Sequence, residues 1–250
     1  MGQAARERLG DRLRWRTAVV TGRRQESGAA VTLELDVPGW PGHVSGQHVD
    51  IRLTAEDGYS TQRSYSIASA PSPGQLEVTV QRLPDGEVSP YLADEVVPGD
   101  RIELRGPVGG WFVWRPEQRE PVLLVAGGSG LVPLMSMIRT RALAGNRAPF
   151  RLLHSVRSPS EQLYGTELAS AGAGLEVTYL YTRQAPHGAS RTPGRLLPSD
   201  LVGGGWAPQA RPTCYVCGPT GFAEKASHYL VLLGHEPERI RTERFGGTGG

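Results

Sequence analysis

The chain has 250 residues, of which 38% are apolar and 21% are charged, a composition typical of globular proteins. Its formal net charge is only +2, and the one local concentration of basic residues is near the start, at Arg6, Arg8, Arg12, Arg14 and Arg16, which argues against a nucleic-acid-binding surface. No stretch approaches the roughly 20 uninterrupted apolar residues of a membrane span, and the start lacks the apolar core of a secretory signal. We therefore expect a cytoplasmic protein that binds neither nucleic acid nor membranes.

Short strands separated by Gly and Pro turns are predicted in the first half of the chain. Runs with β-type patterning follow one another closely, without a helical period between them. The runs are residues 15–22, 29–37, 47–53, 63–69, 75–83 and 100–109. This spacing predicts an antiparallel barrel or sandwich.

The pattern changes from Pro121 onward. Residues 121–128 form a continuous apolar run, typical of a buried parallel strand, and Leu131, Leu134 and Met137 follow at helical spacing. Strand-like and helix-like runs then alternate, at residues 150–156, 160–170, 175–182, 213–218, 221–234 and 239–245. This alternation predicts an open parallel α/β sheet.

A polar segment flanked by prolines, near Pro116 to Pro121, separates the two patterns. Domain boundaries commonly fall in such segments. We therefore predict a basic N-terminal extension at residues 1–14, a β domain at 15–117 and an α/β domain at 118–250.

A glycine-rich turn joins the first apolar strand of the second half to its helix. Gly128, Ser129 and Gly130 allow backbone N–H groups to approach an anion, and the helix dipole favours negative charge at the same place. The turn is not the full G-x-G-x-x-G dinucleotide fingerprint. A purely structural turn therefore remains the alternative.

A second turn of this type follows residues 213–218, where Cys217, Gly218 and Pro219 open another helix. In an open parallel sheet, ligands lie beyond the carboxyl ends of the strands, so this turn should face the same crevice as the first. The alternative for Cys217 is a small buried apolar residue. The spacing of Cys214 and Cys217 is compatible with a redox pair, but residues three apart in a strand point to opposite faces. Two cysteines cannot supply the four thiolates of an iron–sulfur cluster, and we expect no metal site.

Two segments of the first half are candidate ligand sites. Gly86, Val88 and Ser89 precede a possible short helix, whose N-terminus suits a phosphate; the alternative is a surface turn with a serine cap. In the run 63–69, strict alternation places Arg63 and Tyr65 on the face that also carries an isoleucine. A guanidinium suits a phosphate and an aromatic ring suits a flat ligand; the alternative has the tyrosine in the core with the arginine reaching out along it.

Taken together and in this order, the motifs resemble those of the ferredoxin-NADP reductase superfamily, particularly its compact bacterial members without a fused iron–sulfur domain. The resemblance extends from about Trp15 to Phe245. It implies a Greek-key antiparallel β-barrel that binds flavin, followed by an open parallel α/β domain that binds a pyridine nucleotide.

The resemblance assigns roles to residues of the β domain. Within the Arg-x-Tyr-Ser motif, which includes Ser64, it implies that Arg63 contacts the flavin pyrophosphate, Tyr65 stacks on the isoalloxazine and Ser66 lies near N5. Alternation points Ser66 away from Tyr65, so the strand must bend or end there for both to reach the ring. The resemblance further implies that Gly86, Val88 and Ser89 form a second flavin-phosphate loop. The turn implied at the domain junction consists of Gly106, Pro107 and Gly109.

The resemblance also assigns roles in the α/β domain. Gly128, Ser129 and Gly130 form its nucleotide loop, with serine where threonine is usual, and the motif at Cys217, Gly218 and Pro219 places the cysteine beside the nicotinamide C4. Near the end of the chain, Phe245 is implied to cover the other flavin face, with Glu243 as a proton-relay group. The alternative is an edge strand with one buried phenylalanine.

NADPH is predicted over NADH. Arg157 and Arg183 follow two of the strands and offer the cations that a 2′-phosphate needs, and neither strand end shows the acidic residue expected for a ribose hydroxyl.

The predicted activity is hydride transfer from NADPH to a noncovalent FAD at the domain interface, with Ser66, Cys217, Glu243 and Phe245 as the catalytic group. Electrons then pass from this monomer to a separate acceptor such as a ferredoxin, a monooxygenase or a molybdenum enzyme. Two alternatives remain open: an NAD(P)H:flavin reductase that releases its flavin, and a non-catalytic nucleotide-sensing or electron-chain subunit on the same fold.

Overall fold

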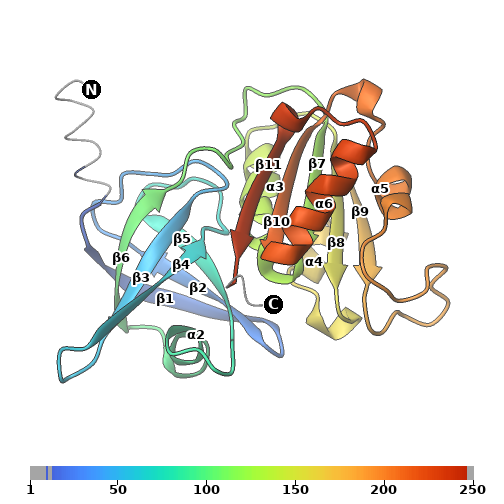
Figure 1. Cartoon of the computed structure of the whole chain (residues 1–250). Helices are drawn as coiled ribbons and strands as arrows, with labels where there is room; N and C mark the ends of the chain where they lie inside the picture. Colours follow the sequence, from blue (N-terminus) through green and yellow to red (C-terminus); the bar gives the residue numbers. More distant parts are fainter. Residues whose placement is uncertain (1–9, 11–12, 247–250) are drawn as a thin grey trace. The chain divides into compact units, whose positions relative to one another are not determined.

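The computed structural model describes Gly10 and residues 13–246 (Figure 1). Most of the predicted basic extension and the end of the chain after Gly246 lie outside the described residues. The described chain divides into two compact units. The first contains the residues up to Arg115 together with Met135–Thr140, and the second contains Pro116–Leu134 and the residues from Arg141 onward. The boundary proposed at residues 117 and 118 stays a prediction.

An antiparallel sheet forms the first unit. Its strands are β1 (Arg16–Ser27), β2 (Ala30–Asp36), β3 (His48–Thr54), β4 (Ser60–Ser66), β5 (Gln75–Gln81) and β6 (Arg101–Val108). In the described chain they form one six-stranded sheet in the order β4-β3-β6-β1-β2-β5, with antiparallel neighbours throughout. The two edge strands meet where Ile67, just after β4, forms an antiparallel bridge with Val78 of β5. The predicted antiparallel β domain is confirmed.

Alternating apolar side chains build the core of this unit. Val31, Leu33 and Leu35 on β2 are at most 1% exposed, and Val78 of β5 packs in the same cluster. Burying one such side chain stabilises the fold by roughly 1.5–3 kcal/mol. The pattern therefore fixes which face of each strand points inward.

Two short helical segments follow β5. They are α2 (Val88–Pro90) and a five-residue π-helical turn (Tyr91–Glu95). Val88 and Leu92 insert into the core of the sheet and are at most 1% exposed. The short helix predicted after Gly86 is present, and its first residue, Val88, is held in place by burial in the core of the sheet.

A parallel sheet forms the second unit. Its strands are β7 (Val122–Gly127), β8 (Phe150–Val156), β9 (Leu175–Tyr181), β10 (Thr213–Pro219) and β11 (Ile240–Phe245). In the described chain the order is β11-β10-β7-β8-β9, and every neighbouring pair is parallel. All six residues of β7 are buried, as its continuous apolar run predicts. The predicted open α/β sheet is confirmed.

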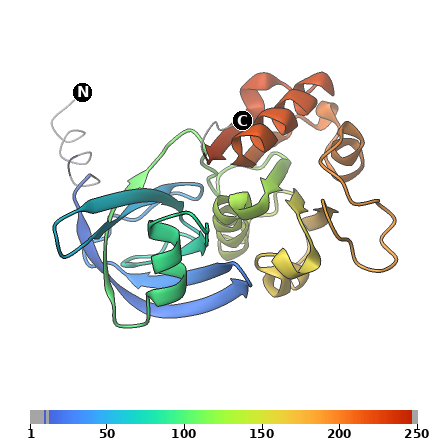
Figure 2. The same ribbon diagram turned by 60° about the horizontal axis from the view of Figure 1, so that its bottom comes forward.

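Helices connect these strands (Figures 1 and 2). They are α3 (Leu131–Leu143), α4 (Gly165–Ala169), α5 (Pro198–Gly204) and α6 (Thr220–Leu232). Short 3-10 turns occur at Gly128–Gly130, Pro159–Glu161, Pro208–Ala210 and Pro237–Arg239. The helix-like run 160–170 is mostly irregular, with a helix only from Gly165, because a proline-led 3-10 turn occupies its first residues.

Helix α5 was not predicted from the sequence. Its seven residues bury only Leu201 and end in two glycines, so they carry no helical apolar period. Asp200 supplies the missing stability: its carboxylate accepts the Leu197 N–H at 2.8 Å and pairs with Arg191 at 2.6 Å. Local polar contacts rather than an apolar stripe form this helix.

Helices α5 and α6 cover one face of the parallel sheet. The cluster beneath them includes Cys214, Val216, Ala223 and Leu230. Because strand residues alternate, Cys217 lies on the other face from Cys214, so the two thiols are not a redox pair. Within the described residues, none of the helices combines the length and apolar character needed to cross a membrane.

Candidate functional site

Arg63 presents an exposed cation on β4. Its guanidinium Nη1 donates to the Thr61 hydroxyl at 3.2 Å and to the Gln62 carbonyl at 2.7 Å. Among the described residues, no carboxylate forms an ion pair with it. Since a guanidinium offers five N–H donors, most of them remain available to an anion.

Tyr65 is half-buried, between exposed Arg63 and fully buried Ile67. Its ring packs against the core of the sheet, and burial raises the pKa of its phenol, with the nearby Arg63 charge opposing that rise. The phenol is therefore neutral at physiological pH. Along the face predicted to carry these three residues, exposure falls from Arg63 to Ile67, and Tyr65 lies between solvent and core.

Ser64 and Ser66 lie in different surroundings. The Ser64 hydroxyl donates to Asp50 at 2.6 Å, and the other oxygen of that carboxylate accepts from Arg105 at 3.0 Å. The Ser64 side chain is thus engaged in the sheet. Ser66 is half-buried and is the last residue of β4. The strand therefore ends at the residue where it must bend or end if Tyr65 and Ser66 are both to reach one ligand.

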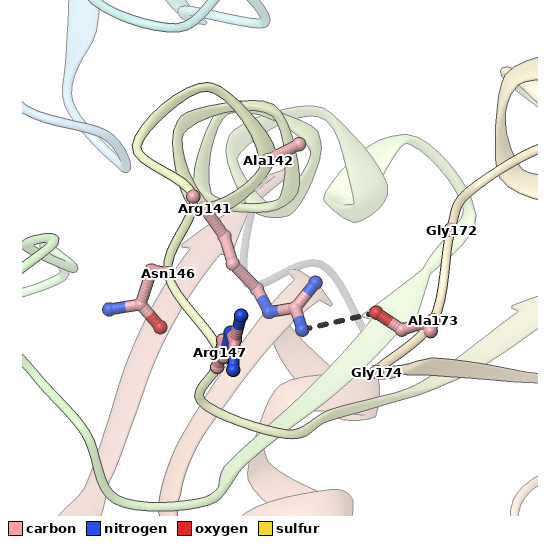
Figure 3. Close-up of a pocket in the computed structure, with 8 residues that line it drawn as sticks. Arg141, Ala142, Asn146, Arg147, Gly172, Ala173 and Gly174 are labelled. Atoms are coloured by element: carbon pink, nitrogen blue, oxygen red, sulfur yellow. Dashed lines mark hydrogen bonds between the residues drawn. The ribbon is translucent and has the colours of Figure 1, made fainter.

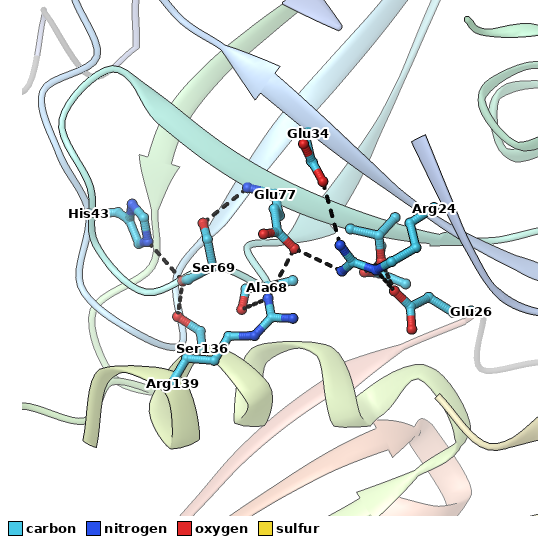
Figure 4. Close-up of polar contacts among 11 residues, drawn as sticks. Arg24, Glu26, Glu34, His43, Ala68, Ser69, Glu77, Ser136 and Arg139 are labelled. Carbon is cyan, nitrogen blue, oxygen red and sulfur yellow. Dashed lines mark hydrogen bonds and ion pairs between the residues drawn. The ribbon is translucent and has the colours of Figure 1, made fainter. Parts of the chain in front are cut away.

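A polar network that sequence reasoning missed fixes the chain just after β4 (Figure 4). The Ser69 carbonyl accepts from Ser136 Oγ at 2.6 Å and from His43 Nε2 at 3.2 Å, and the Ala68 carbonyl accepts from Arg139 at 3.0 Å. Arg139 also pairs with Glu77 at 3.0 Å. These contacts hold the exit of the strand that carries Tyr65 and Ser66.

We expect three histidines with shifted pKa values to make the protein less stable in acid. Burial lowers the pKa of His43, His154 and His235, and that of His154 falls to about 4. The folded chain takes up each of these protons at a lower pH than the unfolded chain, so we expect stability to fall as the pH drops below about 6.5. For His154 alone we expect a loss of about 3 kcal/mol by pH 4, where the decline levels off.

Urea unfolding of wild type and His154→Phe between pH 4 and 8 measures this effect. The variant, which cannot take up that proton in either state, should show a flatter dependence of stability on pH. Parallel curves for the two proteins would contradict the assignment.

The loop that contains Gly86 is closed by its own hydrogen bonds. Ser89 Oγ accepts the Leu83 N–H at 3.1 Å, and the Gly86 N–H donates to the Leu83 carbonyl at 2.9 Å. The alternative, a surface turn with a serine cap, holds in part: the turn lies at the surface and the Ser89 hydroxyl closes it, but Glu87 rather than a serine occupies the cap position of α2. Val88 is buried, so it can offer a ligand only its backbone.

The two glycine-rich turns of the second unit touch each other. A Cβ on Gly130 would lie 2.1 Å from the Cys217 carbonyl oxygen and 2.7 Å from Gly218 N. Likewise, a Cβ on Gly127 or Gly218 would collide with the ring of Phe222. The glycines therefore allow backbone to pack on backbone at the carboxyl ends of β7 and β10. The predicted anion-binding role of the turns stays a prediction.

Cys217 is buried and free, at 1% exposure. Burial raises the pKa of its thiol well above the usual value, and the negative charge of Glu243 adds to that rise. The group is a neutral thiol at physiological pH, not a thiolate nucleophile. If it acts beside a nicotinamide, it does so as a compact neutral group.

Native protein should therefore resist thiol reagents. Burial also raises the pKa of Cys214 to about 12, which leaves about one thiol in ten thousand ionised at pH 8. We expect negligible labelling by a disulfide reagent at pH 8 and two thiols per chain after denaturation in urea. Rapid native labelling of Cys217 would contradict the neutral, enclosed thiol.

Strand β11 brings the predicted end-of-chain residues to the same edge. Glu243 is in register with Cys217, and Phe245 with Pro219. As the alternative holds, β11 is an edge strand, but its phenylalanine is not buried, because Phe245 is 38% exposed. An exposed aromatic ring next to the second glycine turn is consistent with a ring-covering role.

Arg157 and Arg183 lie together beyond β8 and β9. The Arg183 N–H donates to the Arg157 carbonyl at 3.0 Å. Contrary to the sequence expectation, a carboxylate is also present, since Glu161 pairs with Arg157 at 3.5 Å. Among the described residues, Arg183 has no such ion pair, so it is the cation better placed to take a further anion.

A separate cavity of about 490 Å³ lies near the amino ends of the strands of this sheet, opposite the glycine turns (Figure 3). Arg141, Asn146, Arg147 and Gly174 line it, at the amino ends of β8 and β9. Arg141 donates to the Ala173 carbonyl across it at 3.5 Å. Because the glycine turns follow the carboxyl ends of the strands, this cavity is not part of the candidate site. In the described part of the chain, no three metal-ligating side chains gather.

Comparison with protein families identifies both units. The oxidoreductase FAD-binding domain family matches residues 19–113, and the oxidoreductase NAD-binding domain family matches residues 124–228. The chain belongs to the ferredoxin-NADP reductase superfamily. It therefore contains an FAD-binding domain and an NAD(P)-binding domain, in the predicted order.

Individual relatives agree with this membership. The chain is 44% identical over 125 residues to methane monooxygenase component C of Methylosinus trichosporium, covering 50% of this chain and 36% of the relative. It is 30% identical over 204 residues to the ferredoxin--NAD(P)(+) reductase component of the naphthalene 1,2-dioxygenase/salicylate 5-hydroxylase systems of Ralstonia sp, covering 80% and 60%. The chain thus spans between about a third and three fifths of these relatives.

Among solved structures, the chain is similar to the flavohem-like FAD/NAD-binding domain of nitric oxide dioxygenase from Vibrio cholerae O1 biovar El Tor. The TM-score is 0.81 at 27% identity, with 93% of this chain and 99% of that domain covered. The FAD-binding match contains β4, and the NAD-binding match contains both glycine turns. Glu243 and Phe245 lie beyond the matched residues, and the roles assigned to all of the individual site residues stay predictions.

Proposed function

We propose that this reductase-family chain takes a hydride from NADPH onto FAD and passes electrons singly to a separate redox protein. Two features together support the proposal. In the FAD-binding domain, exposed Arg63 has N–H donors available to an anion and lies two residues from half-buried Tyr65. In the NAD-binding domain, the two glycine turns contact each other closely. The first suits a flat phosphorylated ligand, and the second suits a pyrophosphate.

The residues of β4 would bind and orient the flavin. Arg63 supplies a charge-assisted donor for its pyrophosphate, Tyr65 supplies an aromatic face, and Ser66 supplies a hydroxyl near N5. The Gly86 N–H is already bonded within its loop, so the backbone N–H groups of Val88 and Ser89 would bind the same phosphates. Bound FAD supplies the chemistry that splits a two-electron donor into single-electron steps.

The residues of the second unit would bind the nucleotide. Gly128, Ser129 and Gly130 offer first-turn N–H groups to its pyrophosphate. Cys217 would pack beside the nicotinamide as a neutral thiol, together with Gly218 and Pro219. Phe245 would shield the flavin until the nicotinamide enters, and Glu243 would move a proton.

NADPH preference would depend chiefly on Arg183. Glu161 already neutralises part of the Arg157 charge, whereas Arg183 keeps its donors for a 2′-phosphate. We expect Arg183→Ala to raise KM for NADPH about tenfold and to leave KM for NADH within about twofold. Equal changes for both nucleotides would contradict a contact to the 2′-phosphate.

The acceptor would be a separate protein. Relatives that the chain resembles are described as a component of methane monooxygenase and as a reductase component of dioxygenase systems. By that analogy we propose an oxygenase component or a ferredoxin as the acceptor, and a monomeric cytoplasmic reductase as the donor.

Reconstitution tests the proposal. The purified protein is loaded with FAD, passed through an ultrafilter and assayed with NADPH, NADH and ferricyanide. We expect the yellow colour to stay with the protein and ferricyanide to be reduced faster with NADPH. Flavin in the filtrate with retained NADPH-dependent turnover would indicate a flavin reductase instead, and a protein that cannot take up FAD would refute the proposal.

A further inference from the structure

One fully buried histidine contacts the first glycine turn. His154, on β8, is 0% exposed, and its Nε2 lies 3.1 Å from the Gly128 carbonyl oxygen. A carbonyl can only accept, so Nε2 carries the proton and Nδ1 does not. The hydrogen bond therefore fixes a single neutral tautomer.

The other ring nitrogen has no hydrogen-bond partner among the described residues. Burying an unsatisfied acceptor costs about 1–3 kcal/mol, which a phenylalanine of similar shape would avoid. Stability alone therefore does not account for a histidine here. What histidine supplies here and phenylalanine would not is the Nε2–H group that donates to the Gly128 carbonyl.

That N–H controls the orientation of one peptide group. The Gly128 carbonyl accepts both the Leu131 N–H, within the turn, and His154 Nε2 from the neighbouring strand. In a trans peptide, the C=O and the following N–H point in opposite directions. Holding the Gly128 carbonyl toward β8 therefore turns the Ser129 N–H away from that strand.

Gly128 could otherwise adopt more than one orientation. Its φ is +53°, a conformation that glycine exchanges readily with others, and a Cβ there would meet nothing within 4 Å, so the space beside its Cα is open. The Ser129 N–H belongs to a first helical turn, where N–H groups lack partners within the helix. The Gly128 carbonyl is held by the Leu131 N–H within the turn and by His154 Nε2 from β8, so the contact to His154 is the one that ties the direction of the Ser129 N–H to the neighbouring strand.

We propose that His154 is a positioning residue for nucleotide binding, which locks the Gly128–Ser129 peptide so that the Ser129 N–H faces a pyrophosphate. This role rests on the proposed function of the glycine turn. It predicts a separation of effects: losing the donor should weaken phosphate-containing ligands without weakening the fold.

Three variants test the role. His154→Phe keeps the ring and removes the donor, His154→Gln retains an N–H donor, and Tyr179→Phe alters a ring 5.9 Å from the His154 ring without touching Gly128. Calorimetry measures the Kd of ADP-ribose and of adenosine, and steady-state assays of the FAD-loaded protein give KM and kcat for NADPH.

For His154→Phe we expect ADP-ribose to bind about tenfold more weakly, the value for one charge-assisted backbone donor. KM for NADPH should rise similarly, while kcat and adenosine affinity are maintained and the melting temperature at pH 7.5 is at least that of wild type. His154→Gln should recover most of the affinity, and Tyr179→Phe should match wild type.

Unchanged ADP-ribose affinity in His154→Phe would overturn the positioning role, as would equal weakening of adenosine, which would indicate general disruption. Wild-type protein that fails to bind ADP-ribose at all would instead refute the nucleotide site. The failure of the inference and the failure of the proposed function are thus distinguishable.

Discussion

Replacing Arg63 with alanine is expected to weaken FAD binding about 10- to 100-fold, corresponding to the roughly 1.5–3 kcal/mol of a charge-assisted hydrogen bond. The guanidinium is exposed and forms no ion pair with the described residues, so its removal should leave the melting temperature of the flavin-free protein within about 1 °C of wild type. Fluorescence titration of the flavin-free protein with FAD measures the loss.

Arg101→Ala is the matched control, since it removes an exposed arginine from β6 of the same sheet. It should bind FAD as wild type does. If both variants, or neither, lose affinity, the flavin phosphates are not bound specifically by Arg63.

Replacing Gly130 with alanine is expected to destabilise the second unit by about 2–4 kcal/mol, the upper range for an overpacked core. The new methyl group would lie 2.1 Å from the Cys217 carbonyl oxygen, and backbone atoms cannot move aside as a flexible side chain would. The two turns must separate, so ADP-ribose binding should be lost as well. Urea unfolding and amide exchange along β10 measure the effect.

Two glycine variants separate steric from conformational effects. Gly221→Ala has open space and no positive φ, so it should be neutral or slightly stabilising in α6. Gly128→Ala also has space but must adopt φ +53°, which costs about 1 kcal/mol. A Gly130→Ala protein as stable as Gly221→Ala would refute the close contact between the turns.

Much of the fold could be predicted because its signals are local. Alternating residues mark β2 and β5, and the unbroken apolar run of β7 requires a strand covered on both faces. Glycine turns at two strand ends then implied a shared edge, because parallel strands have their carboxyl ends on one side. Each of these inferences uses periodicity or chain direction alone.

The features that were missed depend on polar contacts that no apolar period reports, some of them local and some between distant parts of the chain. Helix α5 is stabilised by the Arg191–Asp200 ion pair, and it has no apolar period by which the sequence could reveal it. The His154 contact joins β8 to a turn 26 residues earlier in the chain, and Arg139 reaches Ala68 across 71 residues. Glu161 approaches Arg157 because a 3-10 turn follows the strand, so the charge at that strand end could not be read from the strand itself.

Anaerobic titration of the FAD-loaded protein with NADPH, and separately with NADH, tests the central claim most directly. We expect loss of the visible flavin absorption with about one equivalent of NADPH per flavin, and recovery of the oxidised spectrum when a one-electron acceptor is added. A flavin that stays oxidised in excess NADPH and NADH would contradict the account, and would favour a nucleotide-sensing subunit on the same fold.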